Sequence, residues 1–241
     1  MRKIILLLLL IAIQVKAGWY EVYTFKGRIG KYPITLSFQK NDGYWGKKEK
    51  YNLIGLYKYD KFNTPITLKG YIKDKKVELF VVKNKKKLEK FMFDFSTTKS
   101  DGIWSNLKKN SSLPLTLQYI HTIDDRGSSD SFKGLEVVQK VSFKKYYFVA
   151  VYKLDKKMPT MAFMSSLKII EKQSNKLFQE IKFTDDSKEV GNIMTSIFDN
   201  IEAVEEKKKL FYLNNNLGRM GDTFIFCWDN KKKKFVREDY K

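Results

Sequence analysis

The chain contains one histidine, His121, and one cysteine, Cys227, so any Ser-His-Asp or Cys-His site would have to include His121. The two residues lie far apart in the sequence, and neither belongs to a nucleophile-elbow motif. A histidine at a strand end is more often structural, and a cysteine inside Phe224 to Trp228 (FIFCW) is more often a small buried side chain. The sequence therefore predicts no catalytic residue and a non-enzymatic protein.

Metal-binding patterns do not favour a cofactor either. Zinc sites need several Cys or His ligands, and this chain has one of each. One acid-rich stretch offers oxygen donors without the spacing of an EF-hand loop, and a solvated linker is the favoured interpretation. Its donors are Asp124, Asp125, Ser128, Ser129 and Asp130. The sequence predicts no metal and no cofactor.

Carboxylates in the second half keep one enzymatic alternative open, a glycan-acting envelope enzyme that uses a pair of acids. The candidates are Glu180, Asp185, Asp186, Glu202, Glu205 and Glu206. No pairing among them can be read from the sequence.

Aromatic residues interleaved with lysines form the candidate binding surface. Aromatic faces stack on sugar rings while lysines attract acidic groups, although alternating aromatic residues also build β-sheet cores, which is the favoured interpretation. The candidate binding residues are Tyr44, Trp45, Lys47, Lys48, Tyr57, Lys58 and Tyr59.

The elements that must position these residues are short β-strands. Pro33, Pro65 and Pro114 each open a similar phrase (PITL, PITL, PLTL), and proline is tolerated at the first residue of a strand or on an edge. Turn signals recur about every ten residues, which is typical of a β-sandwich or an up-and-down barrel. In residues 53–59, alternation places Leu53 and Tyr57 on one face and Leu56 and Lys58 on the other.

The predicted organisation is a mainly β protein with two antiparallel modules. Residues 18–121 form a sandwich or barrel-like module, residues 122–131 (TIDDRGSSDS) a linker, and residues 132–241 a second β module. Apolar residues from Val190 to Val204 recur at helical spacing, so we expect one amphipathic helix over about 188–208.

Residues 1–17 have the pattern of a signal peptide. Arg2-Lys3 precedes an apolar run from Ile4 to Ile13, and small residues lead to a cleavage site near Ala17. The apolar run is about half of the ~20 residues that a membrane-spanning helix needs, and no second long run follows. We expect a periplasmic or secreted mature chain with no transmembrane segment.

The formal net charge is +20, from 47 Lys and Arg against 27 Asp and Glu. Nearly all of the basic residues are lysine, whereas proteins that read nucleic acid favour arginine, so nucleic acid is not an expected partner. Many of the lysines fall in runs between strands, for example at Lys83 to Lys87 and Lys231 to Lys234. Solvated turns that discourage aggregation are the favoured interpretation, and attraction of anionic envelope glycans or lipids remains open.

The stretch Tyr23 to Ile34 (YTFKGRIGKYPI) resembles the opening of a group of poorly characterised exported β-proteins of Gram-negative bacteria. The second Pro-Ile-Thr-Leu and the block from Gly102 to Leu115 continue this likeness over about residues 20–120. Some members are similar to periplasmic lysozyme inhibitors and immunity proteins. The resemblance implies a binding fold and carries over no catalytic residue.

The predicted function is an exported binding protein of the cell envelope that recognises an anionic envelope component or a protein partner. An inhibitor or immunity protein against a secreted cell-wall hydrolase is the alternative within binding functions.

Overall fold

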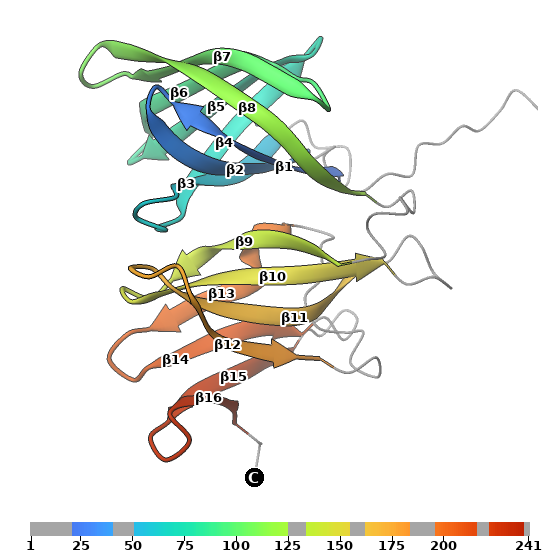
Figure 1. The fold of residues 1–241 in the computed structure, drawn as a ribbon, viewed down its shortest axis with the longest axis vertical. Helices are drawn as coiled ribbons and strands as arrows, with labels where there is room; N and C mark the ends of the chain where they lie inside the picture. Colours follow the sequence, from blue (N-terminus) through green and yellow to red (C-terminus); the bar gives the residue numbers. More distant parts are fainter. Residues whose placement is uncertain are drawn as a thin grey trace, which may run out of the picture.

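The computed structural model describes residues 21–40, 51–124, 134–154, 162–183, 196–215 and 222–238. These residues form antiparallel β-strands in one closed barrel and two further sheets (Figure 1). The predicted mainly β, antiparallel fold is confirmed. Residues 1–17 lie outside the described residues, so the signal peptide stays a prediction.

The first module is an up-and-down barrel in which each strand pairs with the next and β8 closes onto β1. Its strands are β1 (Glu21–Ile29), β2 (Tyr32–Lys40), β3 (Leu53–Tyr59), β4 (Ile66–Lys73), β5 (Lys76–Lys83), β6 (Lys86–Asp94), β7 (Lys99–Asn106) and β8 (Ser111–Asp124). Of the two architectures that the sequence left open for this module, the structure has the barrel.

Aromatic side chains fill the barrel. Phe25 stacks on Phe38, with ring centroids 5.8 Å apart, and Phe93 lies edge-on to Phe25. Toward the other end, Tyr57 packs against Phe91 at 4.9 Å. Because these rings are buried and touch one another, the barrel interior is a hydrophobic core.

The proline phrases mark two of the three expected strand starts. Pro33 is the second residue of β2, and Pro65 directly precedes β4. Pro114 instead lies inside β8, opposite Ile103 of β7, and its carbonyl accepts a hydrogen bond from Gly30. The expectation that this third proline opens a strand is wrong.

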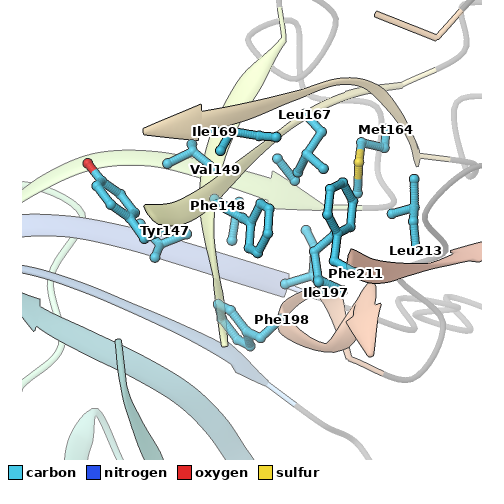
Figure 2. Close-up of a cluster of buried hydrophobic side chains, with 14 of the residues drawn as sticks. Tyr147, Phe148, Val149, Met164, Leu167, Ile169, Ile197, Phe198, Phe211 and Leu213 are labelled. Carbon is cyan, nitrogen blue, oxygen red and sulfur yellow. The ribbon is translucent and has the colours of Figure 1, made fainter. Parts of the chain in front are cut away.

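The second module consists of two four-stranded sheets. One has the order β12-β11-β10-β9 and the other the order β13-β14-β15-β16. The strands are β9 (Leu135–Ser142), β10 (Tyr146–Leu154), β11 (Ala162–Glu171), β12 (Leu177–Lys182), β13 (Ile201–Glu205), β14 (Leu210–Asn215), β15 (Asp222–Asp229) and β16 (Lys234–Arg237). Side chains from both sheets meet in one core, with Phe148 of β10 against Phe211 of β14 (Figure 2).

The predicted helix over 188–208 is wrong for the part that the structure describes. Ile197–Asp199 form a single 3-10 turn, Ile201–Glu205 form strand β13, and 206–209 form a tight turn. Residues 188–195 lie outside the described residues. The apolar residues at helical spacing belong to two elements: Ile197 and Phe198 are buried by the turn, and Ile201 by the strand that follows.

The outer wall of the barrel packs against the second module. Val22, Leu56 and Ile123 face away from the barrel interior and belong to the same buried cluster as the second module's core. A hydrogen bond from the Ile197 amide to Gln39 Oε1 (2.9 Å) joins the two modules in this buried layer. Strand β3 is consequently buried on both faces, and its inward and outward residues are those that the alternation predicts.

The predicted boundary lies close to the end of β8. This strand extends to Asp124, so residues 122–124 of the predicted linker belong to it. Residues 125–131 lie outside the described residues.

Candidate functional site: the hairpin face

Eight tight hairpins join each odd-numbered strand to the next even-numbered one. In an antiparallel sheet with sequential strand order, alternate connections lie at the same end. The turns β1–β2, β3–β4, β5–β6 and β7–β8 therefore share one end of the barrel. The turns of the second module project on the same side of the molecule as those of the barrel (Figure 1). We call this surface, made by residues 30–31, 60–65, 84–85, 107–110, 143–145, 172–176, 206–209 and 230–233, the hairpin face.

Hydrogen bonds connect these turns across the two modules. Asn63 of the β3–β4 turn donates to the carbonyl of Lys172 at 3.0 Å, and the Lys172 amide donates to the Lys145 carbonyl at 2.9 Å. The Lys144 amide in turn donates to Glu206 Oε2 at 3.0 Å. Four turns that are distant in sequence are thus held next to one another.

Lysines dominate the hairpin face. Its lysines are Lys31, Lys61, Lys85, Lys108, Lys109, Lys144, Lys145, Lys172, Lys176, Lys207, Lys208, Lys209, Lys231, Lys232 and Lys233. All are exposed except the half-buried Lys172, and the same turns contain only two acids, Asp60 and Glu206. Salt bridges to neighbouring acids engage Lys145, Lys208 and Lys232.

At the opposite end of the barrel, the described turns carry a different charge. Its described turns are β4–β5, with Asp74 and Lys75, and β6–β7, with the uncharged residues 95–98. Among the described turns, those of the hairpin face therefore contain many more lysines than acids, whereas the two turns at the opposite end contain one of each.

Four lysines of the hairpin face lie over aromatic rings. Lys31 is 5.8 Å from the ring centroid of Tyr32, and Lys61 is 5.7 Å from that of Phe62. Lys145 and Lys209 have the same relation to Tyr146 and Trp228, at 5.3 and 5.6 Å. Tyr32 and Phe62 are 49% and 63% exposed, so the face offers flat apolar rings beside positive charges.

The three predicted binding residues that the structure describes, Tyr57, Lys58 and Tyr59, do not form one exposed surface. Tyr44, Trp45, Lys47 and Lys48 lie outside the described residues. Tyr57 is fully buried in the barrel, as the core interpretation of the aromatic pattern expected. Tyr59 is half-buried below the hairpin face, with Tyr57 at 5.5 Å and Tyr32 at 6.3 Å between ring centroids.

Lys58 is buried between the two modules. Its ammonium group donates to Asn63 Oδ1 at 2.6 Å and to Asp60 Oδ1 at 2.9 Å, and lies 5.3 Å from the ring centroid of Tyr147. These contacts hold the β3–β4 turn against the second module. Lys58 is thus a structural residue of the hairpin face and offers no free charge to a ligand.

A carboxylate lies inside the barrel below the same end. Glu89 Oε2 accepts hydrogen bonds from the Tyr57 hydroxyl at 2.6 Å and from Trp104 Nε1 at 3.1 Å. Burial raises the pKa of Tyr57 far above its ordinary value, and the hydrogen bond to Glu89 adds a smaller increase. Tyr57 therefore stays protonated and keeps donating to Glu89.

His121 lines a cleft of about 610 Å³ between the barrel and the second module. Its Nε2 lies 3.1 Å from the carbonyl of Glu136, and burial lowers the pKa of the imidazole. Tyr147, on the opposite wall, donates to Asn175 Oδ1 at 2.8 Å, and burial raises its pKa to about 12.

The other sequence candidates lie apart. Cys227 is on β15 with its Sγ 3.6 Å from Glu238, and burial raises the pKa of its thiol. Glu205 accepts from Tyr212 and pairs with Lys208, and Glu180 accepts from Ser166. Asp185 and Asp186 lie outside the described residues, and so do Asp125, Ser128, Ser129 and Asp130. Among the described residues, no group of three His, Cys, Asp or Glu side chains could hold a metal ion.

Sequence reasoning found the lysine-rich turns but missed their common location and their aromatic partners Tyr32 and Phe62. The usable signal was the alternation of the connections along the chain. Once a run of antiparallel strands is predicted, every second connection lies at the same end of the sheet. The lysines in the connections can then be counted for each end.

Comparisons with known proteins identify no relative. No family model matches the chain, and no curated protein or solved structure is significantly similar to it. The resemblance to exported β-proteins therefore stays an expectation. In the described part of the chain, no helix has the length and apolar character needed to span a membrane.

Proposed function

We propose that the protein is an exported, non-enzymatic binding protein that holds an acidic glycan on its hairpin face. The observation that carries this proposal is the excess of lysine over acidic residues in the described turns of the hairpin face, next to exposed aromatic rings. A repeating anion such as a uronic-acid polysaccharide can contact many lysines at once, which makes up for the small contribution of each exposed ion pair.

The aromatic residues favour a glycan over other anionic surfaces. The exposed rings of Tyr32 and Phe62 lie beside Lys31 and Lys61, so a sugar ring can stack on an aromatic face while its carboxylate meets the adjacent ammonium group. The hydrogen bonds among the β3–β4, β9–β10, β11–β12 and β13–β14 turns hold several of these positive charges in fixed relative positions. A preorganised face loses less conformational entropy on binding than free lysine-rich tails would.

Two turns of the barrel provide a matched test. Lys83, Lys85 and Lys86 surround the β5–β6 turn on the hairpin face, and Lys73, Lys75 and Lys76 surround the β4–β5 turn at the other end with the same spacing. Each triple is replaced by alanine, and binding to an immobilised uronic-acid polysaccharide is measured against salt concentration. At about 0.5 kcal/mol per exposed pair, we expect the first triple to weaken binding roughly tenfold at low salt. The second triple should leave binding unchanged.

The outcomes separate the location of the site from simple charge. Equal loss of polysaccharide binding in both triple variants would mean that only net charge matters, and it would contradict a binding site on the hairpin face. If 0.5 M salt does not weaken binding to the polysaccharide, the binding is not electrostatic, because salt at this concentration screens charges beyond a few ångströms. Binding to anionic lipid vesicles without binding to the polysaccharide contradicts the glycan assignment.

A further inference from the structure

A groove of about 440 Å³ separates two strand edges of the second module. Strand β12 is the last strand of one sheet and β16 the last strand of the other, and both line this groove. At one point a single side chain bridges them. The side-chain Nε2 of Gln179 donates to the backbone carbonyl of Phe235 at 2.7 Å, and the side-chain Oε1 of Gln179 accepts from the backbone N–H of Phe235 at 2.8 Å.

Gln179 takes the place that a neighbouring strand would occupy. Its amide group makes the same pair of hydrogen bonds to Phe235 that the N–H and C=O of one residue of an added strand make in an antiparallel ladder. The side-chain amide of Gln179 thus fills the gap between β12 and β16 at this position. The gap itself continues along β16 past Phe235.

The backbone of Arg237 faces this continuing gap. Along a strand, the backbone groups of alternate residues point to the same side, so those of Arg237 point the same way as those of Phe235. The Glu238 amide points the opposite way and donates to Ile225 of β15 at 2.8 Å. The N–H and C=O of Arg237 have no protein partner among the described residues.

The charges around the groove favour an anion. The Arg237 guanidinium stacks on the Phe224 ring at 3.6 Å from its centroid, without an acidic partner among the described residues. Lys182 and Lys234 line the same groove, and the described part of the lining contains one acid, Glu180, which accepts from Ser166 at 2.8 Å. Arginine held in this way presents its planar donors to a carboxylate.

We propose that this groove binds an extended acidic peptide segment of a protein partner as an added strand. The peptide backbone pairs with Arg237, continuing the pattern that Gln179 begins at Phe235. Acidic side chains contact Arg237, Lys182 and Lys234, and the alternate side chains of the peptide lie on the apolar floor that includes Phe224 and Phe226. A glycan does not supply the regularly spaced N–H and C=O groups that this edge requires, so the site is distinct from the hairpin face.

The test uses a fluorescein-labelled eight-residue peptide of alternating Val and Glu, with binding measured by fluorescence anisotropy. Arg237→Gln should weaken binding at least tenfold, because it removes the charge-assisted hydrogen bonds from the guanidinium to the carboxylates of the peptide. Arg28→Gln is the matched control, since Arg28 is an exposed arginine on β1 of the barrel. It should leave binding unchanged, as should the alanine triple at Lys83, Lys85 and Lys86.

A second peptide separates strand addition from charge alone. Methylation of the backbone nitrogens of alternate residues keeps the side chains and removes the ladder donors, so we expect this peptide not to bind. Equal binding of the two peptides overturns strand addition. Equal weakening by Arg237→Gln and Arg28→Gln overturns the location in the groove, and loss of peptide binding in the lysine triple assigns the peptide to the hairpin face instead.

Discussion

His121 is fixed in one tautomer by its surroundings. Because a backbone carbonyl only accepts hydrogen bonds, Nε2 must carry the proton that it shares with Glu136. Nδ1 is buried and has no hydrogen-bond partner among the described residues. Protonation would add a charge and an unpaired donor there, so the folded state favours neutral imidazole.

His121 contributes a pH dependence to the stability of the fold. Burial lowers the pKa of His121 in the folded state, with a smaller opposing effect from the Glu136 carbonyl, while the unfolded chain titrates near pH 6.5. Between these values the unfolded state binds more protons, so the free energy of unfolding falls as the pH drops below about 6.5. The slope contributed by one group is at most about 1.4 kcal/mol per pH unit.

Urea unfolding between pH 5 and pH 8 measures this effect. His121→Gln keeps a donor for the Glu136 carbonyl and does not titrate, so we expect its stability to be flatter than that of the wild type over this range. Carboxyl and lysine side chains ordinarily titrate outside this window. An identical slope in the two proteins would show that His121 is not the group responsible.

Two hairpin turns of the barrel use lysine where glycine is usual. Asp74-Lys75 and Asn84-Lys85 each form a two-residue turn in which both residues have positive φ, at 48° and 68° and at 49° and 62°. Such turns favour Asn or Asp followed by glycine, because a side chain in the left-handed region costs about 1–2 kcal/mol. Lysine at these positions places charge at the tip of the turn at the expense of stability.

Lys75→Gly and Lys85→Gly should therefore each raise the free energy of unfolding by about 0.5 kcal/mol, after the larger unfolded-state entropy of glycine is subtracted. Lys76→Gly is the control, since Lys76 is the first residue of β5 and is not among the positive-φ residues. It should lower stability. Chemical denaturation of the three variants checks the prediction, and destabilisation by all three would contradict the turn geometry as the cause.

The sequence predicted most elements but only part of the candidate site. Alternation predicted the two faces of β3, because Leu53 and Tyr57 contact the barrel core while Leu56 contacts the core of the second module. Helical spacing gave a wrong prediction at Ile197 and Ile201, because a 3-10 turn followed by a short strand places buried residues at the same spacing as a helix would. Strand pairing between distant segments, which creates the groove at Gln179 and Arg237, depends on tertiary contacts that local patterns do not contain.

At the scale of the whole molecule, the barrel and the second module share buried contacts. Leu56 of the barrel lies in the same cluster as Phe148 and Phe211, and Gln39 of β2 satisfies the buried amide of Ile197. The Ile197 carbonyl accepts from Tyr152, Gln139 and Asn200, at 3.1 Å in each case. Separating the modules would expose this apolar surface to water and would break the hydrogen bond between the Ile197 amide and Gln39.

We therefore predict that the two modules unfold as one cooperative unit. Leu79→Ala creates a cavity deep in the barrel, away from the second module, and should cost about 2–5 kcal/mol. If the modules are coupled, hydrogen exchange at the Phe148 and Phe211 amides of the second module should accelerate as much as exchange in the barrel, roughly 30-fold or more. Leu56→Ala, at the contact between the modules, is the comparison variant. Acceleration confined to the barrel in Leu79→Ala would mean that the modules unfold separately and that their interface only docks two independent units.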